Sequence, residues 1–343
     1  MKYTVVDLFS GAGGLELGFL NAGFDVIFST DWDDDCEKVH ALNLPGIPYL
    51  KADVYDLSDD VLDKYITRDV DILVGGPPCQ GFSTIGKRIS SDPEKRVEFD
   101  SRNTLFKQYI RILKHIKPKM FLMENVEGLL TRDKGKIFEN IKETFQETGY
   151  EFNYVVLNAA DYGVPQIRKR VFFYGNRIGV KLTPPKQTNY ESKEPKWKTT
   201  GSAINDLASL SSSDIPNHVP LVHGEKNIAR YKLIPEGGRL PEKNLPPELY
   251  RKNFGNTFKR LHRNKPSLTM VPGHNAFPIH PWLDRSLTVR EAARIQTFPD
   301  DFVFVGRRDK QCMQVGNAVP VKLAEAWANN YKEVLDEYYK KEV

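Results

Sequence analysis

The chain has 343 residues, of which 40% are hydrophobic and 27% charged, a balance typical of a soluble globular protein with one large core or a large and a smaller one. No apolar run approaches the roughly 20 residues of a membrane helix, and the N-terminus leads directly into a predicted strand. We therefore expect no signal peptide, no membrane anchor and a cytoplasmic location. The net charge of +4 permits a nucleic-acid partner without indicating one.

The cysteines and histidines show no metal-binding pattern. Cys36, Cys79 and Cys312 lie far apart in the sequence and form no Cys-x-x-Cys pair. This spacing argues against a disulfide framework or a structural zinc site, and it favours a reducing compartment. The seven histidines are scattered without ligand spacing. We expect no metal site.

The N-terminal residues resemble the start of a nucleotide-binding fold. A strand is predicted at residues 3–9, a glycine-rich turn at 10–14 and a helix at 15–22. Glycines here allow a tight turn and the close approach of a ligand to the backbone. The turn departs from the G-x-G-x-x-G pattern because Glu16 occupies the third glycine position, which disfavours a dinucleotide. The chain also has no P-loop.

Two further predicted strands end in acidic residues. The strand at 25–30 leads to Asp31 and Trp32, and a strand near 49–51 leads to Asp53. Asp31 suits hydrogen bonds to ribose hydroxyls, Trp32 offers a face for an adenine, and Asp53 suits an exocyclic amine. A capping Asp beside a surface Trp is the alternative interpretation. An adenosine site without provision for phosphates suggests S-adenosylmethionine.

A rigid segment places a thiol at the end of the next predicted strand. Residues 70–74 predict a buried parallel strand, and the two glycines and two prolines at 75–78 make a stiff, extended exit before Cys79. A lone Cys is most often a small buried hydrophobe. The rigid frame and the polar Gln80 and Ser83 favour a nucleophile instead, at the strand edge where ligands bind in open α/β sheets.

A carboxyl group is expected beside this thiol. Residues 83–102 are too long for an ordinary connection and predict a basic lid over an anionic substrate. A helix at 103–116 and a strand at 120–123 follow, and that strand leads to Glu124. Sequential parallel strands are commonly neighbours, so we expect Cys79 and Glu124 to face one pocket. A thiol beside a carboxyl group can attack an electron-poor ring while protonating it.

A pair of arginines follows in the chain. After a helix at 135–148 and a strand at 152–157, Arg168 and Arg170 alternate along an extended segment that continues as a strand at 171–175. Both side chains would project to one side. They form either a solvated basic edge or a guanidinium clamp on a base carbonyl or phosphate.

Together these segments resemble the cytosine carbon-5 DNA methyltransferases. The family motifs occur in order at residues 7–14 (DLFSGAGG), 76–83 (GPPCQGFS), 124–126 (ENV), 166–170 (QIRKR), 290–299 (REAARIQTFP) and 314–320 (QVGNAVP). They span nearly the whole chain, and only about 185–255 carries none. The resemblance implies a doubly wound, mostly parallel α/β sheet of the class I methyltransferase type, with a smaller, loop-rich target-recognition domain.

The resemblance also implies the chemistry. Cys79 would attack carbon 6 of a cytosine flipped out of double-stranded DNA, while Glu124 hydrogen-bonds or protonates nitrogen 3, so that carbon 5 takes the methyl group of S-adenosylmethionine. Arg168 and Arg170 would support the base and the nucleophile's surroundings, and Gln80 and Ser83 the phosphates or the loop. The implied cofactor-binding residues are Asp7, Phe9, Gly11, Gly13, Gly14, Asp31, Trp32, Asp53, Val54, Pro78, Leu105, Asn317 and Val319.

The composition changes at residues 183–198, where prolines and lysines predict a linker. We expect a catalytic and cofactor-binding domain at 1–185, a target-recognition domain at 186–282, a hinge segment at 283–313 and a return to the catalytic domain at 314–343. A final helix at 321–339 would pack on the first domain and bring Asn317 to the cofactor. Residues 338–343 are expected to fray.

Basic residues interleaved with aromatics in the second half fit phosphate contacts and base reading, although a solvated face over an ordinary core is the alternative. Arg239 is a candidate for insertion into the duplex. The predicted DNA-binding residues are Lys87, Arg88, Arg239, Arg251, Lys259, Arg260 and Arg263. The resemblance further suggests a monomer with a cognate restriction endonuclease encoded nearby.

Three alternative functions are open: the same chemistry on RNA, a catalytically silent DNA-binding relative, and a dinucleotide oxidoreductase. The segment between 177 and 257 favours a reader of duplex DNA. The intact Cys79, Glu124 and arginine pair argue against a silent relative, and the missing glycine argues against the oxidoreductase. The recognised DNA sequence is not predicted, because base reading falls in the motif-poor stretch.

Overall fold

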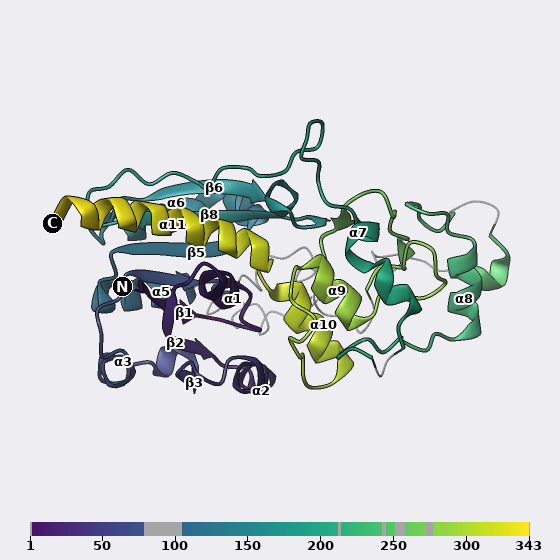
Figure 1. Cartoon of the computed structure of the whole chain (residues 1–343), viewed down its shortest axis with the longest axis horizontal. Helices are drawn as coiled ribbons and strands as arrows, with labels where there is room; N and C mark the ends of the chain where they lie inside the picture. The colour runs from purple at the N-terminus through teal and green to yellow at the C-terminus, as the bar shows by residue number, and fades with distance from the viewer. Residues whose placement is uncertain are drawn as a thin grey trace.

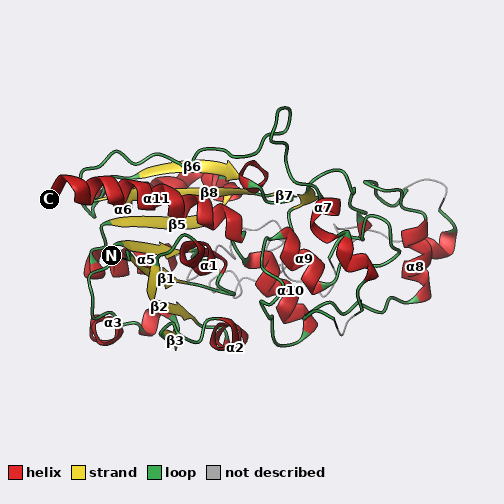
Figure 2. Ribbon diagram, in the orientation of Figure 1, coloured by secondary structure: helices red, strands yellow, loops and turns green. Residues whose placement is uncertain are grey.

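The computed structural model describes residues 2–78, 105–211, 214–241, 245–250, 258–271 and 277–342. It has two parts: a lobe built on a β-sheet, which holds both termini, and a second lobe of helices and loops at residues 199–317 (Figures 1 and 2). Several residues predicted to act in catalysis or DNA binding lie outside the described residues: Cys79, Gln80, Ser83, Lys87, Arg88 and Arg251.

Within the described residues, seven strands form one sheet in the order β3-β2-β1-β4-β5-β8-β6. Neighbours from β3 to β5 are parallel, whereas β8 runs antiparallel to both β5 and β6. The predicted mostly parallel sheet is confirmed. The strands are β1 (Thr4–Leu8), β2 (Asp25–Asp31), β3 (Tyr49–Lys51), β4 (Ile72–Gly75), β5 (Met120–Val126), β6 (Asn153–Asn158) and β8 (Lys169–Asn176).

Helices cover both faces of this sheet, which explains why its central strands β1 and β4 are buried along their whole length. One face packs against α1 (Gly14–Asn21) and α11 (Val321–Glu342). The other packs against α3 (Asp59–Tyr65), α5 (Leu105–Ile116) and α6 (Lys136–Gln146). The doubly wound arrangement is therefore confirmed. The helix α2 (Asp34–Asn43) links β2 to β3.

The last helix returns to the first lobe, as the sequence predicts. Trp327 and Tyr331 are fully buried against the sheet, and the Tyr331 hydroxyl donates a hydrogen bond to the Phe121 carbonyl at 2.8 Å. The expected fraying from residue 338 onward is wrong. The helix continues to Glu342 because the Tyr339 ring stacks on Tyr3, with centroids 5.7 Å apart.

The second lobe has few regular elements. Its apolar core is centred on α9 and also includes Ala12 and Val39 of the first lobe. Residues on both sides of position 282 share this core, and the domain boundaries stay a prediction. Its helices and strands are α7 (Thr200–Ile204), α8 (Glu225–Lys232), α9 (Val289–Ile295), α10 (Arg308–Asn317) and β9 (Ser267–Leu268), which pairs with β7 (Gln166–Ile167).

Short 3-10 helices are described in both lobes, at Val54–Asp56, Glu127–Leu130, Arg132–Gly135, Ala159–Tyr162, Asp206–Ser209 and Pro247–Leu249.

Gly18 allows α1 and α11 to approach closely, since a Cβ atom built on it would lie 2.6 Å from the Glu325 nitrogen. We expect Gly18→Ala to lower the free energy of unfolding by roughly 1–3 kcal/mol, because the backbone of α11 must shift. Gly128→Ala is the matched control, because a Cβ there meets nothing within 4 Å. Urea denaturation compares the two variants, and equal midpoints would contradict this packing.

Candidate active site

The predicted site residues gather at one edge of the sheet. Strands β1 to β5 are parallel, so their carboxyl ends point the same way and the loops that follow them lie together. These loops hold the glycine-rich turn, Asp53 and Pro78, while Asp31 is the last residue of β2 and Glu124 lies near the end of β5. This is the edge at which ligands bind in open α/β sheets.

The glycine-rich turn has an open surface on one side and a packed one on the other. Phe9, Gly11 and Gly13 have φ values of 57°, 56° and 80°, and a Cβ built on Gly11 would meet nothing within 4 Å. A Cβ on Gly14 would instead overlap the carbonyl oxygen of Val319. The segment around Val319 therefore lies against the turn, as the resemblance implies.

Glu16, which replaces the third glycine of the dinucleotide pattern, is fully buried. Its Oε1 accepts a hydrogen bond from the Ser29 hydroxyl at 2.7 Å and lies 3.0 Å from His40 Nε2. Asp7 is buried as well, and burial together with the nearby Glu16 carboxyl raises the pKa of Asp7. These two carboxyl groups belong to the interior behind the turn.

Asp31 joins the second strand to the glycine-rich turn. Its Oδ2 accepts a hydrogen bond from the Gly11 amide at 2.9 Å, and its Oδ1 accepts one from Asp33 at 3.0 Å. Burial raises the pKa of Asp31, and these N–H donors oppose the shift. Trp32 is 64% exposed, so its ring is free to stack on a ligand. The N-cap of α2 is Asp33, not Asp31.

The loop after β3 is held from outside the site. Asp53 caps the 3-10 helix at Val54–Asp56, and Val54 is buried. Arg111 of α5 donates to the carbonyls of Val54 at 3.2 Å and Leu57 at 2.7 Å. This support could not be predicted from the sequence, because Arg111 belongs to no motif.

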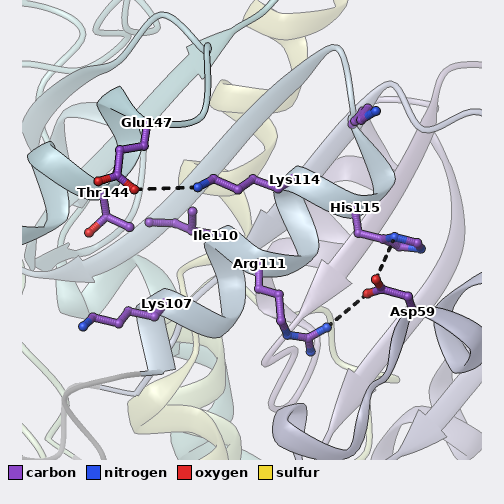
Figure 3. Close-up of a pocket in the computed structure, with 9 residues that line it drawn as sticks. Asp59, Lys107, Ile110, Arg111, Lys114, His115, Thr144 and Glu147 are labelled. Carbon is purple, nitrogen blue, oxygen red and sulfur yellow. Dashed lines mark hydrogen bonds and ion pairs between the residues drawn. The ribbon is translucent and has the colours of Figure 1, made fainter.

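Arg111 also lines a hollow of about 810 Å³ on the outer side of α5 (Figure 3). Its side chain reaches toward Asp59, and Lys114 pairs with Glu147 across the same surface. Among the residues that the structure describes, none of those predicted to be catalytic or cofactor-binding lines the hollow. It is therefore separate from the candidate active site.

The carboxyl group of Glu124 lies at the centre of the site. It is 8% exposed, and its Oε1 lies 2.9 Å from Arg170 Nε. A Cβ built on Gly76 would lie 3.3 Å from Glu124 Oε2, so the carboxyl group faces the backbone that leaves β4. Burial raises the pKa of Glu124, while Arg170 and Arg168 oppose that shift. The predicted adjacency of the two strands is confirmed.

The exit from β4 is fixed by the next residue of β5. The Asn125 side chain is buried and donates a hydrogen bond to the Pro77 carbonyl at 3.1 Å. This bond holds residues 76–78 in front of Glu124. Pro78, half-buried, then leads to residue 79.

Arg168 and Arg170 do not form a solvated basic edge, so that interpretation is wrong. Arg168 is 1% exposed and donates to the carbonyls of Met270 at 3.2 Å and Gly316 at 3.0 Å. Burial lowers the pKa of both guanidinium groups. Arg170 pairs with Glu124, and Arg168 holds the backbone around the site.

Leu105 and Asn317 are two further residues predicted to bind the cofactor. Leu105, half-buried, begins α5, and Asn317, exposed, ends α10. The Asn317 carbonyl accepts a hydrogen bond from Arg168 at 3.4 Å.

Comparisons with known proteins agree with this geometry. A family model described as "C-5 cytosine-specific DNA methylase" matches residues 3–333. The type II methyltransferase M1.HphI of Haemophilus parahaemolyticus is 41% identical over 96% of this chain and 86% of its own length. The type II methyltransferase M.NgoFVII of Neisseria gonorrhoeae is 36% identical over 97% and 89%.

The chain belongs to the C-5 cytosine-specific DNA methylase family. It is a DNA (cytosine-5)-methyltransferase. Among solved structures, a protein titled as a DNA modification methyltransferase encoded within a prophage in E. coli superposes with a TM-score of 0.76 at 26% identity, covering 98% of this chain and all of that one. The Dnmt2 methyltransferase of S. pombe superposes with a TM-score of 0.67 at 16% identity, over 98% and 100% of the two chains, which shows the shared fold.

The residues of the methyltransferase that are predicted to bind DNA differ from one another in exposure and contacts. Arg239 is exposed, and its backbone forms a bridge with half-buried Lys259. Burial, with Arg239 nearby, lowers the pKa of Lys259. Arg263 is half-exposed, pairs with Glu236 at 3.0 Å and lies over the Trp282 ring.

The prediction of a DNA contact by Arg260 is wrong. Its side chain is 5% exposed and points into the second lobe. It donates to the carbonyls of Tyr231, Ile234, His280 and Leu283 and pairs with Asp284. The guanidinium group thereby binds carbonyls at the end of α8 and in the loop at residues 280–283.

In the part of the methyltransferase that the structure describes, no three His, Cys, Asp or Glu side chains are grouped to hold a metal ion. The helices described there include none long and apolar enough to cross a membrane.

Cys36 and Cys312 are buried, and burial raises the pKa of both thiols, that of Cys312 to about 11. We therefore expect Ellman's reagent to label one thiol rapidly in the native methyltransferase, that of Cys79, and all three after denaturation. Cys79→Ser should show no rapid labelling. Fast reaction of that variant would contradict the burial of the other two thiols.

Proposed function

We propose that this methyltransferase transfers the methyl group of S-adenosylmethionine to carbon 5 of a cytosine flipped out of double-stranded DNA, through a covalent bond between Cys79 and carbon 6. The observation that supports this most strongly is the buried carboxyl group of Glu124. It is paired with Arg170 and faces the backbone that leads from β4 to Cys79. This supports a ring-protonating group close to the point at which the backbone reaches the proposed nucleophile.

The residues at the carboxyl edge suit S-adenosylmethionine. The surface beside Gly11 is open, Asp31 is anchored by two amides, and the Trp32 ring is exposed. No basic side chain occurs within the turn at residues 9–14, so an adenosine fits better than a pyrophosphate. The residues that would hold the cofactor are Phe9, Gly11, Gly13, Asp31, Trp32, Asp53, Val54, Pro78, Leu105, Asn317 and Val319. When bound, it supplies a methyl group activated by a positively charged sulfur.

The protein's own residues would perform the ring chemistry. The thiolate of Cys79 forms a bond to carbon 6, and the ring electrons move toward nitrogen 3 and carbon 5. Glu124 donates a proton or a hydrogen bond to nitrogen 3, for which its raised pKa is suited. Carbon 5 then takes the methyl group. A base removes the carbon-5 proton, the electron pair of that C–H bond forms the double bond between carbons 5 and 6, and the thiolate leaves. Nitrogen 3 then returns its proton to Glu124.

The target cytosine must leave the helix, because stacking hides carbon 6. Arg239, Lys259 and Arg263 are the described candidates for contacts with the duplex, and Lys87, Arg88 and Arg251 are candidates from the sequence alone. Because the relatives named above are type II methyltransferases, we further propose a cognate restriction endonuclease, a monomeric enzyme and action in the cytoplasm.

Replacing the carboxyl group of Glu124 with an amide, which cannot donate a proton to the base, tests the role of Glu124. We expect Glu124→Gln to lower kcat by about 10²- to 10⁴-fold, because the amide cannot protonate nitrogen 3, while DNA affinity stays within about threefold on a gel-shift assay. Glu127→Gln is the matched control, because Glu127 is exposed just after the same strand. Equal methyl-transfer rates for the two variants would rule out the proposed role of Glu124.

Bisulfite sequencing tests the overall function and identifies the recognition site. Mixed genomic DNA is incubated with the enzyme and S-adenosylmethionine, and we expect protected cytosines at one position of a recurring sequence. Cys79→Ser should give none. Methyl incorporation into RNA but not into DNA would contradict the proposal.

A further inference from the structure

Two buried glutamines connect distant parts of the chain. Gln166 and Gln296 are fully buried, and Gln166 Nε2 donates to Gln296 Oε1 at 2.9 Å. Gln296 Nε2 in turn donates to the carbonyls of Val315 at 2.8 Å and Ala318 at 3.2 Å. Residues 315–318 are the last turn of α10 with its C-cap residue Ala318, and they are called the 315–318 turn below. The bonds from Gln296 hold both ends of this turn, which includes Asn317.

The same side chains hold Met270 of the second lobe. The Met270 amide donates to Gln166 Oε1 at 2.9 Å, and its carbonyl accepts from Arg168 at 3.2 Å. Arg168 also donates to the carbonyls of Gly316 and Asn317. Both backbone polar groups of Met270 and the 315–318 turn are therefore bound by one set of three side chains.

The two ends of this network belong to different binding surfaces. Met270 follows β9 by two residues, and the segment before β9 contains Arg263, a candidate for DNA contact. At the other end, Asn317 is exposed and Val319 lies against Gly14 of the glycine-rich turn.

A buried guanidinium and two buried amides are a costly way to fill a core, since apolar side chains of equal volume are often as stabilising. Buried polar networks fix one arrangement, because any displacement leaves polar groups unpaired. A shift of Met270 would break its bonds to Gln166 and Arg168. Arg168 also holds the turn directly, and Gln166 is bonded to Gln296, which holds the turn.

We propose that Gln166, Arg168 and Gln296 are positioning residues that couple the two sites, so that DNA held by the second lobe tightens cofactor binding at Asn317. The inference rests on the proposed function, because it takes the carboxyl edge to be the cofactor site. By thermodynamic linkage, the cofactor must tighten DNA binding by the same factor.

The coupling is measured with the full-length protein and S-adenosylhomocysteine, which cannot react. Its Kd is determined by calorimetry with and without a duplex containing the sequence that bisulfite mapping identifies. We expect DNA to tighten binding in the wild type by about 5- to 150-fold. In Gln296→Met the factor should fall to about 2 or less. Gln166→Met should have the same effect from the other end of the network, and it tests the proposal independently if one variant does not fold.

The double variant shows whether the two glutamines act as one unit that couples the sites or only make independent structural bonds. If the glutamines act together, Gln166→Met and Gln296→Met combined should lose no more coupling than either alone. Asn43→Ala is the control for lost stability. The Asn43 side chain makes two hydrogen bonds to the Val303 backbone and one to the Val39 carbonyl, and none of these bonds reaches the 315–318 turn. Its coupling factor should match the wild type.

A wild-type factor near 1, or an unchanged factor in Gln296→Met, would overturn the proposal. If the wild-type protein bound no S-adenosylhomocysteine under either condition, the proposed cofactor site itself would be wrong, and this inference with it.

Discussion

The ion pair between Glu124 and Arg170 is the interaction on which the active edge depends. A carboxyl group this deeply buried would cost several kcal/mol as an unpaired charge, and the antiparallel strand β8 brings the compensating guanidinium beside it. Burial still raises the pKa of Glu124. The site therefore holds an acid in a fixed place while keeping it easier to protonate than a surface glutamate.

The second lobe solves a different problem. It has few regular elements, and buried backbone carbonyls are rarely left unpaired in a protein interior. Arg260 donates to four carbonyls within the lobe, and Arg168 donates to the carbonyls of Met270 and Gly316. Arg290 of α9 does the same for Pro216, Pro299 and Phe302. These buried guanidinium groups connect loops and helix ends that are far apart in the sequence.

This difference explains what the sequence could predict. In the first lobe, short apolar strands joined by helices restrict the topology, so the adjacency of β4 and β5 and the position of Glu124 followed from the chain order. In the second lobe, Arg260 and Arg263 have similar sequence surroundings, yet one is buried and the other half-exposed. Tertiary contacts alone decide this, and no periodic pattern records them. Arg111, Asn125 and the pairing of Gln166 with Gln296 were missed for the same reason.

The central claim is that the thiol of Cys79 bonds to the target cytosine beside Glu124. It is tested most directly with duplex DNA in which 5-fluorocytosine replaces the methylated base, because fluorine cannot leave as a proton does. The account predicts a complex that survives denaturing electrophoresis and a cross-linked peptide containing Cys79. An adduct on Cys36 or Cys312, or full inhibition without any adduct, would contradict it.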